Sequence, residues 1–413
     1  MKPAEFASGR KSAVFHSRAN EPDSPRAWLV VTAAFIAGFV VFGITYSFGV
    51  FLEPIAAEFQ VSRAATSALF SITGLVFYFA GSITGRLADR FGPAIVVGAG
   101  AAVTGASLAC ASIVDGLWMG YLVYGLGLGI GAACAYVPTL ALVGGWFVKH
   151  RTTALGIAAA GTGCGMLIVP PTCAALIAGF GWRMTFVVMG VGCALLLAIC
   201  AIVVKPAPLA SASADRPLRR VVRTPEFAML YASWVLATTA LFVPFVFLPA
   251  FALEHGASPV AASALLSLFG GVSILGRVGI GALGERIGIV ALFKTAVLVM
   301  AASYAWWLVA GSYASLVGFT VVLGLAYGIR IALMPGVLIE AFGTANLGAV
   351  LGTFFTASGI AAALGPPLAG AIVDISGDHR WGIAFALATG LLGFVAVIPL
   401  KLGQRTAENQ NLR

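Results

Sequence analysis

The chain has 413 residues, of which 60% are apolar and only 9% are charged. This composition excludes an ordinary soluble globular domain, in which about 25% of the residues carry a charge. The net charge of +9 would indicate a nucleic-acid partner only if the basic residues formed one patch. Their distribution along the chain is instead typical of a membrane protein. The composition therefore predicts a polytopic membrane protein that binds no nucleic acid.

Apolar segments long enough to cross a hydrocarbon core of about 30 Å recur along the whole chain. They are too long and too uniform for barrel strands, so we expect helices, whose backbone groups pair internally in lipid. The predicted fold is an all-α polytopic membrane protein with twelve transmembrane helices. The expected spans are residues 28–53, 63–84, 93–113, 117–145, 152–180, 183–204, 227–253, 258–280, 289–310, 314–340, 347–373 and 380–400.

The basic residues indicate the orientation in the membrane. With the N-terminus inside, the outer connections hold only Arg63, Arg183 and Arg380, and Arg277 and Arg330 lie within spans. All other Lys and Arg residues fall on the cytoplasmic side, which predicts cytoplasmic termini in a plasma membrane or bacterial inner membrane. The expected domains are a cytoplasmic tail (1–26) that is no signal peptide, an N-terminal six-helix bundle (27–204), a cytoplasmic linker (205–225), a C-terminal six-helix bundle (226–400) and a cytoplasmic tail (401–413).

Sites for catalysis, metals and cofactors are not expected. The six cysteines all fall within predicted spans of the first half without CxxC spacing, which favours plain packing. A glycine-rich run at 125–131 follows no strand, so it does not predict a nucleotide loop. Nothing resembles a metal cluster or a nucleophilic triad, and we predict that the chain is not an enzyme.

An internal repeat divides the spans into two sets of six. The segment Gly85–Gly92, GRLADRFG, recurs as Gly281–Gly288, GALGERIG. Such a duplication predicts two related halves. The motif resembles a loop signature of the major facilitator superfamily, in which a conformational latch is the favoured role and helix capping the alternative. The candidate latch residues are Gly85, Asp89, Arg90, Gly281, Glu285 and Arg286.

A second resemblance is more specific. The segment 147–151, FVKHR, followed by Ala154, Gly156, Ala158 and Gly161, is similar to the helix-5 signature of the monocarboxylate transporter family. Segments 335–343 and 364–370 resemble the second half of that family. Three departures indicate a bacterial member: only Trp28 is left of the first-helix signature, Ser273 replaces an acidic residue, and Tyr46 lies near the place of a lysine.

This resemblance implies a secondary active carrier of small monocarboxylates, such as lactate or pyruvate, that works by alternating access. Proton coupling is expected, although the departures leave the proton route open, and the driving force is either a proton gradient or a counter-anion. The expected partners are the small carboxylate and the lipid bilayer. A monomer suffices, and the sequence leaves the oligomeric state open.

Arg277 is the main candidate for the substrate site. It is a permanent cation inside the 258–280 span, where burial costs at least several kcal/mol. No Asp or Glu lies near the middle of any predicted span, so we expect its partner to be a visiting anion. The resemblance implies the same, because Arg277 falls at the family's substrate-binding arginine on helix 8. The alternative is a structural arginine that bonds helix-end carbonyls.

Other residues within the spans are weaker candidates for the same site. Tyr46, Tyr136 and Tyr327 offer hydroxyl groups that would orient a hydroxy- or keto-acid, or they are packed aromatics. Phe354 and Phe355 wall or gate the cavity, or belong to the core. Arg330 is either a second anion contact or an arginine that reaches the cytoplasmic face or the backbone near Pro335.

Three other functions fit the sequence less well. An exchanger for oxalate-like dicarboxylates would need Arg330 in the cavity, and the 347–373 span lacks the lysine that such exchangers pair with their arginine. A drug-efflux carrier would carry an antiporter motif that the 152–180 span lacks. A non-transporting membrane sensor would need an appended soluble domain large enough to signal.

Overall fold

The computed structural model describes residues 23–147, 150–206, 218–278, 288–342 and 347–400. Within these ranges all regular structure is helical. The first half consists of α1 (Pro25–Tyr46), α2 (Phe48–Phe59), α3 (Arg63–Phe91), α4 (Pro93–Ala111), α5 (Leu117–Gly120), η2 (Tyr121–Leu128), α6 (Gly129–Trp146) and α7 (Arg151–Val203). The second half consists of α8 (Leu218–Val221), α9 (Pro225–Glu254), α10 (Pro259–Val278), α12 (Ile289–Leu308), α13 (Tyr313–Phe342), α14 (Leu347–Ser376) and α15 (His379–Val397).

The predicted number of spans agrees with these helices once two local features are considered. The first span bends at Ser47, between α1 and α2, where the side-chain hydroxyl donates to the carbonyl of Gly43 at 2.6 Å. The long helix α7 contains Gly181 with φ +77°, a left-handed conformation that divides it into two helices. The described residues contain 11 apolar helices of membrane-spanning length, and this division of the longest one agrees with the twelve predicted spans.

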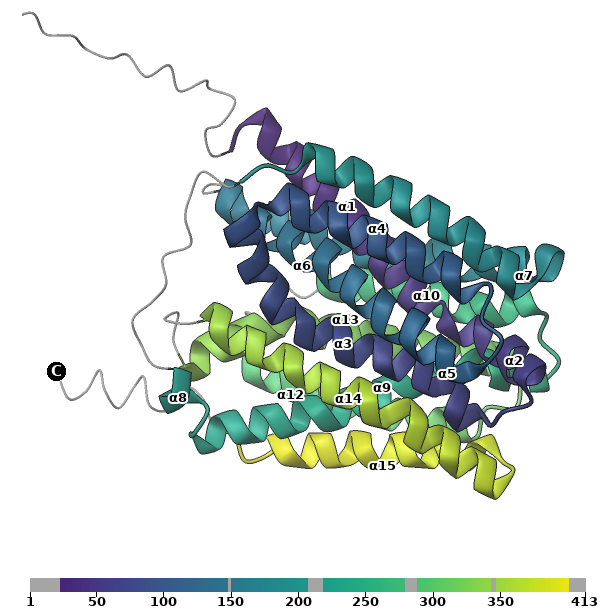
Figure 1. Ribbon diagram of the computed structural model, residues 1–413. Helices are drawn as coiled ribbons and strands as arrows, with labels where there is room; N and C mark the ends of the chain where they lie inside the picture. The colour runs from purple at the N-terminus through teal and green to yellow at the C-terminus, as the bar shows by residue number, and fades with distance from the viewer. Residues whose placement is uncertain (1–22, 148–149, 207–217, 279–287, 343–346, 401–413) are drawn as a thin grey trace, which may run out of the picture.

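The two halves lie side by side, with the first half above the second in the view of Figure 1. They meet where α7 packs on α10, α3 on α14 and α2 on α9. We call the end that carries connections 60–62 and 255–258 the outer end, and the opposite end, near α8, the inner end.

The repeated motif has the same backbone geometry wherever both copies are described. Gly92 has φ +91° and Gly288 has φ +87°, and a helix begins directly after each. We expected the first copy to form a turn, but residues 85–91 are the last turns of α3. The reversal is confined to Gly92, because a left-handed glycine followed by Pro93 ends one helix and starts the next.

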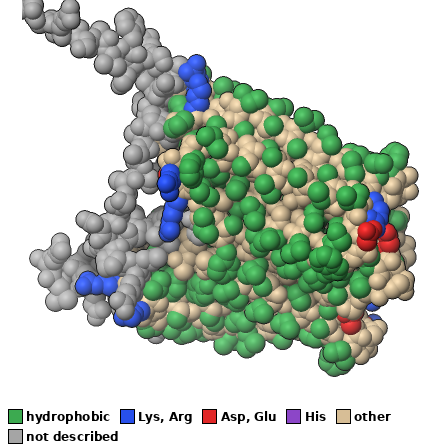
Figure 2. All heavy atoms as spheres, in the orientation of Figure 1, with side chains coloured by type: hydrophobic (Ala, Val, Ile, Leu, Met, Phe, Trp, Pro, Cys, Tyr) green, Lys and Arg blue, Asp and Glu red, His purple; other side chains and the backbone are tan. Residues whose placement is uncertain are grey.

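The surface agrees with a membrane environment. Figure 2 shows hydrophobic side chains covering the side of the bundle, with Lys and Arg at the inner end and acidic groups beside a basic group at the outer end. Large apolar side chains such as Ile113, Leu195 and Ile202 are exposed on the bundle. Because lipid is itself apolar, this exposure is what a membrane-spanning helix requires.

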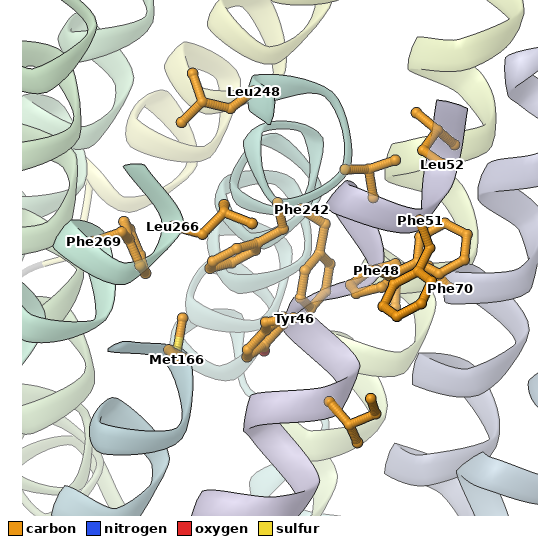
Figure 3. Close-up of a cluster of buried hydrophobic side chains, with 14 of the residues drawn as sticks. Tyr46, Phe48, Phe51, Leu52, Phe70, Met166, Phe242, Leu248, Leu266 and Phe269 are labelled. Atoms are coloured by element: carbon orange, nitrogen blue, oxygen red, sulfur yellow. The ribbon is translucent and has the colours of Figure 1, made fainter. Parts of the chain in front are cut away.

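The buried core is shared between the halves only toward the outer end. One cluster joins Tyr46, Phe51 and Phe70 of the first half to Phe242 and Phe269 of the second (Figure 3). Toward the inner end the described core residues form two separate clusters, one around Trp146 in the first half and one around Phe227 in the second. The described contacts therefore join the halves mainly at their outer ends.

Candidate functional site

Arg277 lies in the last turn of α10, where that helix crosses the first half. Its Nη1 atom donates to the carbonyl of Ala159, at 3.3 Å, and to the hydroxyl of Thr162, at 3.2 Å, both on α7. These bonds join the two halves. Bonds of this kind are what the alternative role of Arg277, a structural arginine, predicts. They use Nη1, however, and Nε is buried without a partner among the described residues.

The positive charge of Arg277 has no acidic counterpart among the residues that the structure describes. Ion pairs that join Arg63, Arg183 and His379 to acidic residues lie far from it, at the outer end of the bundle. Instead, the guanidinium carbon lies 5.8 Å from the centre of the Tyr327 ring. A cation in this position favours an anion that can approach its remaining nitrogens.

Three tyrosines lie in the region of this arginine, and the Tyr327 ring lies directly beside it. Tyr46 on α1, Tyr136 on α6 and Tyr327 on α13 are all buried. The charge of Arg277 acts on both Tyr46 and Tyr136, and both of these also interact with Tyr327. The structure therefore brings together four predicted site residues from four helices and both halves.

Tyr78 belongs to the same group, and the sequence analysis missed it. It lines the same cavity as Tyr46, and its ring stacks on Phe355 at a centroid distance of 6.0 Å. One signal was present: Tyr78 is a hydroxyl-bearing side chain in the middle of an apolar span. It was hidden because Phe77 and Phe79 flank it and make the segment look purely apolar.

A small cavity lies beside Tyr46, on the side where α1, α3 and α9 meet. Its walls are mainly aromatic and its exposed lining is apolar. Arg277 does not line this cavity, but Tyr46 lines it and also interacts with Arg277. The lining residues are Val41, Phe42, Thr45, Tyr46, Phe70, Gly74, Phe77, Tyr78 and Phe242.

The two adjacent phenylalanines of α14 have different surroundings. Phe354 is buried in the second half, where its ring packs 5.5 Å from Phe227 and 5.8 Å from Trp234. Phe355 is 44% exposed and reaches Tyr78 of the other half. Only Phe355 is placed beside the tyrosine group.

Arg330 on α13 is fully buried within the second half. Its Nη2 atom donates to the hydroxyl of Thr238, at 3.0 Å, and to the carbonyl of Trp234, at 3.3 Å. The guanidinium carbon also lies 4.0 Å from the centre of the Trp234 ring, a cation–π contact. These contacts all go to α9, so Arg330 faces a helix of its own half.

The candidate latch residues are described in the first half only. Gly85, Asp89 and Arg90 lie on the last turns of α3, where Asp89 and Arg90 are exposed and Arg90 lies 5.3 Å over the Phe91 ring. The second copy, with Gly281, Glu285 and Arg286, lies outside the described residues.

Comparisons with known proteins identify the family. The chain matches the Major Facilitator Superfamily over residues 34–310 and again over 236–412. It is 31% identical over 392 residues to monocarboxylate transporter 13 of Bos taurus, covering 93% of this chain and 91% of that protein. The chain belongs to the monocarboxylate transporter family.

Other relatives of this family member agree with the assignment. It is 26% identical over 415 residues to monocarboxylate transporter 12 of Xenopus laevis, covering 91% of this chain and 90% of that protein. It is 28% identical over 399 residues to the MFS transporter asaE of Aspergillus flavus, covering 92% and 88%. The predicted family is confirmed, and the chain is a membrane transporter and not an enzyme.

The fold of this monocarboxylate transporter family member also agrees with a solved structure. A bacterial homologue of the human lysosomal transporter Spinster, inward-facing and unoccupied, superposes with a TM-score of 0.75 at 16% identity, covering 90% of this chain and 97% of that one. This similarity confirms the predicted major facilitator fold.

Ser273 lies one turn before Arg277 on α10, at the place where the resemblance implies an acidic residue in animal members. Its side chain is fully buried, and its hydroxyl donates to the carbonyl of Gly270 at 2.8 Å. The Ser273 carbonyl lies directly against Gly328 of α13, a contact that leaves no room for a Cβ. An acidic side chain at position 273 would therefore be buried in a tightly packed contact between α10 and α13.

Proposed function

We propose that this transporter carries small monocarboxylates, lactate- or pyruvate-like, by alternating access, with Arg277 holding the carboxylate. The observation that carries the proposal is the position of Arg277. It lies at the junction of the halves, has no acidic partner among the described residues, and lies in the region of tyrosines from both halves. The names of the relatives support the same class of substrate.

The hydrogen bonds of Arg277 support a specific sequence of events. A carboxylate that reaches the guanidinium offers a full negative charge and two parallel hydrogen bonds, whereas the Ala159 carbonyl and the Thr162 hydroxyl are uncharged acceptors. The substrate would therefore replace contacts that tie α10 to α7. Binding and the relative movement of the halves are thereby linked, as alternating access requires.

The tyrosines and the aromatic cavity account for selectivity. The hydroxyl groups of Tyr46, Tyr136 and Tyr327 can bond the 2-hydroxyl or 2-keto oxygen of the substrate, and the aromatic walls favour its short apolar end. A doubly charged substrate would need a second cation at this place.

We further propose that transport is proton-coupled and that both termini lie in the cytoplasm. The family resemblance supports the coupling, with the proton carried by the substrate acid or held near Arg277. The distribution of Lys and Arg supports the orientation.

Uptake of labelled acids into proteoliposomes tests the substrate proposal. We expect Arg277→Ala to reduce the uptake of monocarboxylates by roughly 10- to 100-fold, because charge-assisted hydrogen bonds contribute about 1.5–3 kcal/mol. Arg277→Lys should restore only part of the activity, since it keeps the charge but not the planar fork. The matched control is Arg220→Ala, which removes the same charge from the exposed helix α8.

Two outcomes contradict the proposal. Undiminished uptake by Arg277→Ala would show that Arg277 does not bind the substrate. Uptake that follows a counter-anion and ignores an imposed pH gradient would replace proton coupling with exchange.

A further inference from the structure

A charged cluster joins the two halves at the outer end. It contains Glu53 on α2, Arg63 on α3, Glu254 on α9 and His379 at the start of α15, and we call it the outer cluster. Arg63 Nε lies 2.8 Å from Glu53 Oε1, and Arg63 Nη2 lies 3.3 Å from Glu254 Oε1. His379 Nδ1 lies 2.9 Å from the other oxygen of Glu254. One carboxylate therefore accepts from a cation of the first half and an imidazole of the second.

His379 is unusual among these groups because it is buried. Only 6% of it is exposed, and its ring lies edge-on to Phe247 and Phe251. Its Nε2 atom has no partner among the described residues, and the same holds for the indole nitrogen of Trp307. The two side chains line one narrow pocket at the outer end of the second half. Nε2 is thus a basic nitrogen that is not occupied by the protein.

The charges of the outer cluster can pair in two ways. With a neutral His379, the negative charge of Glu254 has no cationic partner in its own half and is balanced by Arg63 across the interface. With a protonated His379, the imidazolium balances Glu254 within the second half, and Glu53 balances Arg63 within the first. The Arg63–Glu254 ion pair then contributes much less to holding the halves together, because two cations share one carboxylate.

We propose that His379 is a proton-binding site that controls the outer end: a proton from the outside lets the halves part there. The proposal rests on the alternating access proposed above and adds a residue through which external acid acts on it. The Arg63–Glu254 bridge suits such a role, because a partly exposed ion pair contributes only about 0–1 kcal/mol and is easily broken. External acid would then favour the state that admits substrate from outside.

The other charged groups near His379 do not provide the same link. Asp374 of α14 accepts from the backbone nitrogens of Arg63 and Ala64, at 3.2 and 2.9 Å, and joins the halves without using a histidine. On its own helix, Asp378 accepts from the backbone nitrogen of Arg380 at 2.8 Å.

A second histidine among the described residues of the outer end, His255, serves as a matched control. His255 at the end of α9 bonds the carbonyl of Phe251 through Nδ1, at 2.8 Å, and stacks on that ring. It lies at the same end of the bundle as His379 but bonds a carbonyl instead of a carboxylate.

Distances between spin labels at the outer end test the proposal without any substrate. Ala57→Cys on α2 and Val260→Cys on α10 place one exposed label on each half, in a full-length background whose six native cysteines have been replaced. We expect the population with a long label–label distance to rise several-fold in nanodiscs as the pH falls from 8 to 5.5. His379→Gln should abolish this rise, and His255→Gln should leave it unchanged.

A second variant makes the test independent of the folding of His379→Gln. Glu254→Gln removes the shared carboxylate and should give a large long-distance population at every pH. An unchanged pH response in His379→Gln, no pH response in the parent, or a short distance at all pH values in Glu254→Gln would each overturn the proposal.

Uptake of labelled lactate by the same preparations separates this proposal from the proposed function. Absent uptake with a normal pH response would reject the cargo and keep the proton site. Normal lactate uptake, together with a pH response of the label distances that His379→Gln leaves unchanged, would keep the cargo and reject the proton site.

Discussion

Two arginines lie within the spans, and their surroundings suit them to different tasks. Arg277 bonds α7 of the opposite half and keeps a nitrogen without a partner among the described residues. Arg330 bonds α9 of its own half and lies against the Trp234 ring. In the proposed alternating access, a cation between the halves can exchange its partners during transport, whereas a cation inside one half keeps them. For this reason the proposed substrate site includes Arg277 and not Arg330.

Arg330→Met provides a test of this distinction. Arg330 is fully buried, and its Nε and Nη1 atoms have no partner among the described residues. Replacing a poorly compensated buried charge by an apolar side chain of similar length is often neutral or stabilising by about 1–4 kcal/mol. We expect an unchanged or higher melting temperature in detergent and continued monocarboxylate uptake. A lower melting temperature, or uptake lost only for dicarboxylates, would indicate an anion bound at Arg330.

The tyrosine hydroxyls should matter only for substrates that can bond them. Tyr136→Phe and Tyr327→Phe should raise the KM for lactate and pyruvate by roughly 2- to 10-fold, because one hydrogen bond contributes about 0.5–1.5 kcal/mol. The KM for propionate, which has no oxygen at the second carbon, should change little. Tyr313→Phe is the control, since that hydroxyl bonds the carbonyl of Ala261 at the outer end. An equal rise in KM for all three acids would mean that these tyrosines act by packing and do not bond the substrate.

At the scale of the helices, α7 shows how one element serves both the fold and the movement. Gly161 and Gly165 lie directly against the carbonyls of Phe35 and Phe39 on α1, in the same half. Gly163, on another side of α7, faces Ile274 of α10 in the opposite half. Small residues allow such close helix contacts in a membrane. One side of α7 therefore packs within the first half, and another packs against the second half, where the proposed movement would take place.

Alanine substitutions separate these two roles of α7. In Gly161→Ala the new Cβ meets the backbone of Phe35, which cannot move aside, and we expect a loss of about 1–3 kcal/mol of stability. In Gly163→Ala the Cβ meets the Ile274 side chain at 2.5 Å, so the contact between the halves must shift. We expect a smaller fall in melting temperature and a several-fold change in uptake rate. The opposite order of the two melting temperatures would contradict this assignment.

At the scale of the whole molecule, the core shows which ends of the halves are joined. The cluster around Tyr46 and Phe242 contains residues of both halves, whereas the clusters around Trp146 and Phe227 each belong to one half. The outer cluster and Asp374 add polar contacts at the same end. In the orientation and mechanism proposed above, these contacts must break to admit a substrate from outside, and the proposed proton site acts on their ionic part.

The sequence by itself determined the overall architecture: the apolar spans, the repeated motif and the family. These follow from local composition and spacing, because a run of apolar residues is helical in lipid whatever lies beside it. The sequence also singled out Arg277, because a cation in a span is costly wherever the helix packs.

Only the tertiary structure decided which side chains meet. In a soluble helix the apolar face marks the inside, but a span is apolar on its lipid side and on its packed side, so that pattern no longer assigns faces. For this reason the sequence did not separate Phe354 from Phe355, left two roles open for Arg330, and missed Tyr78. The outer cluster is a further example, since Arg63, Glu254 and His379 come from three distant segments that only the packing of the two halves brings into contact.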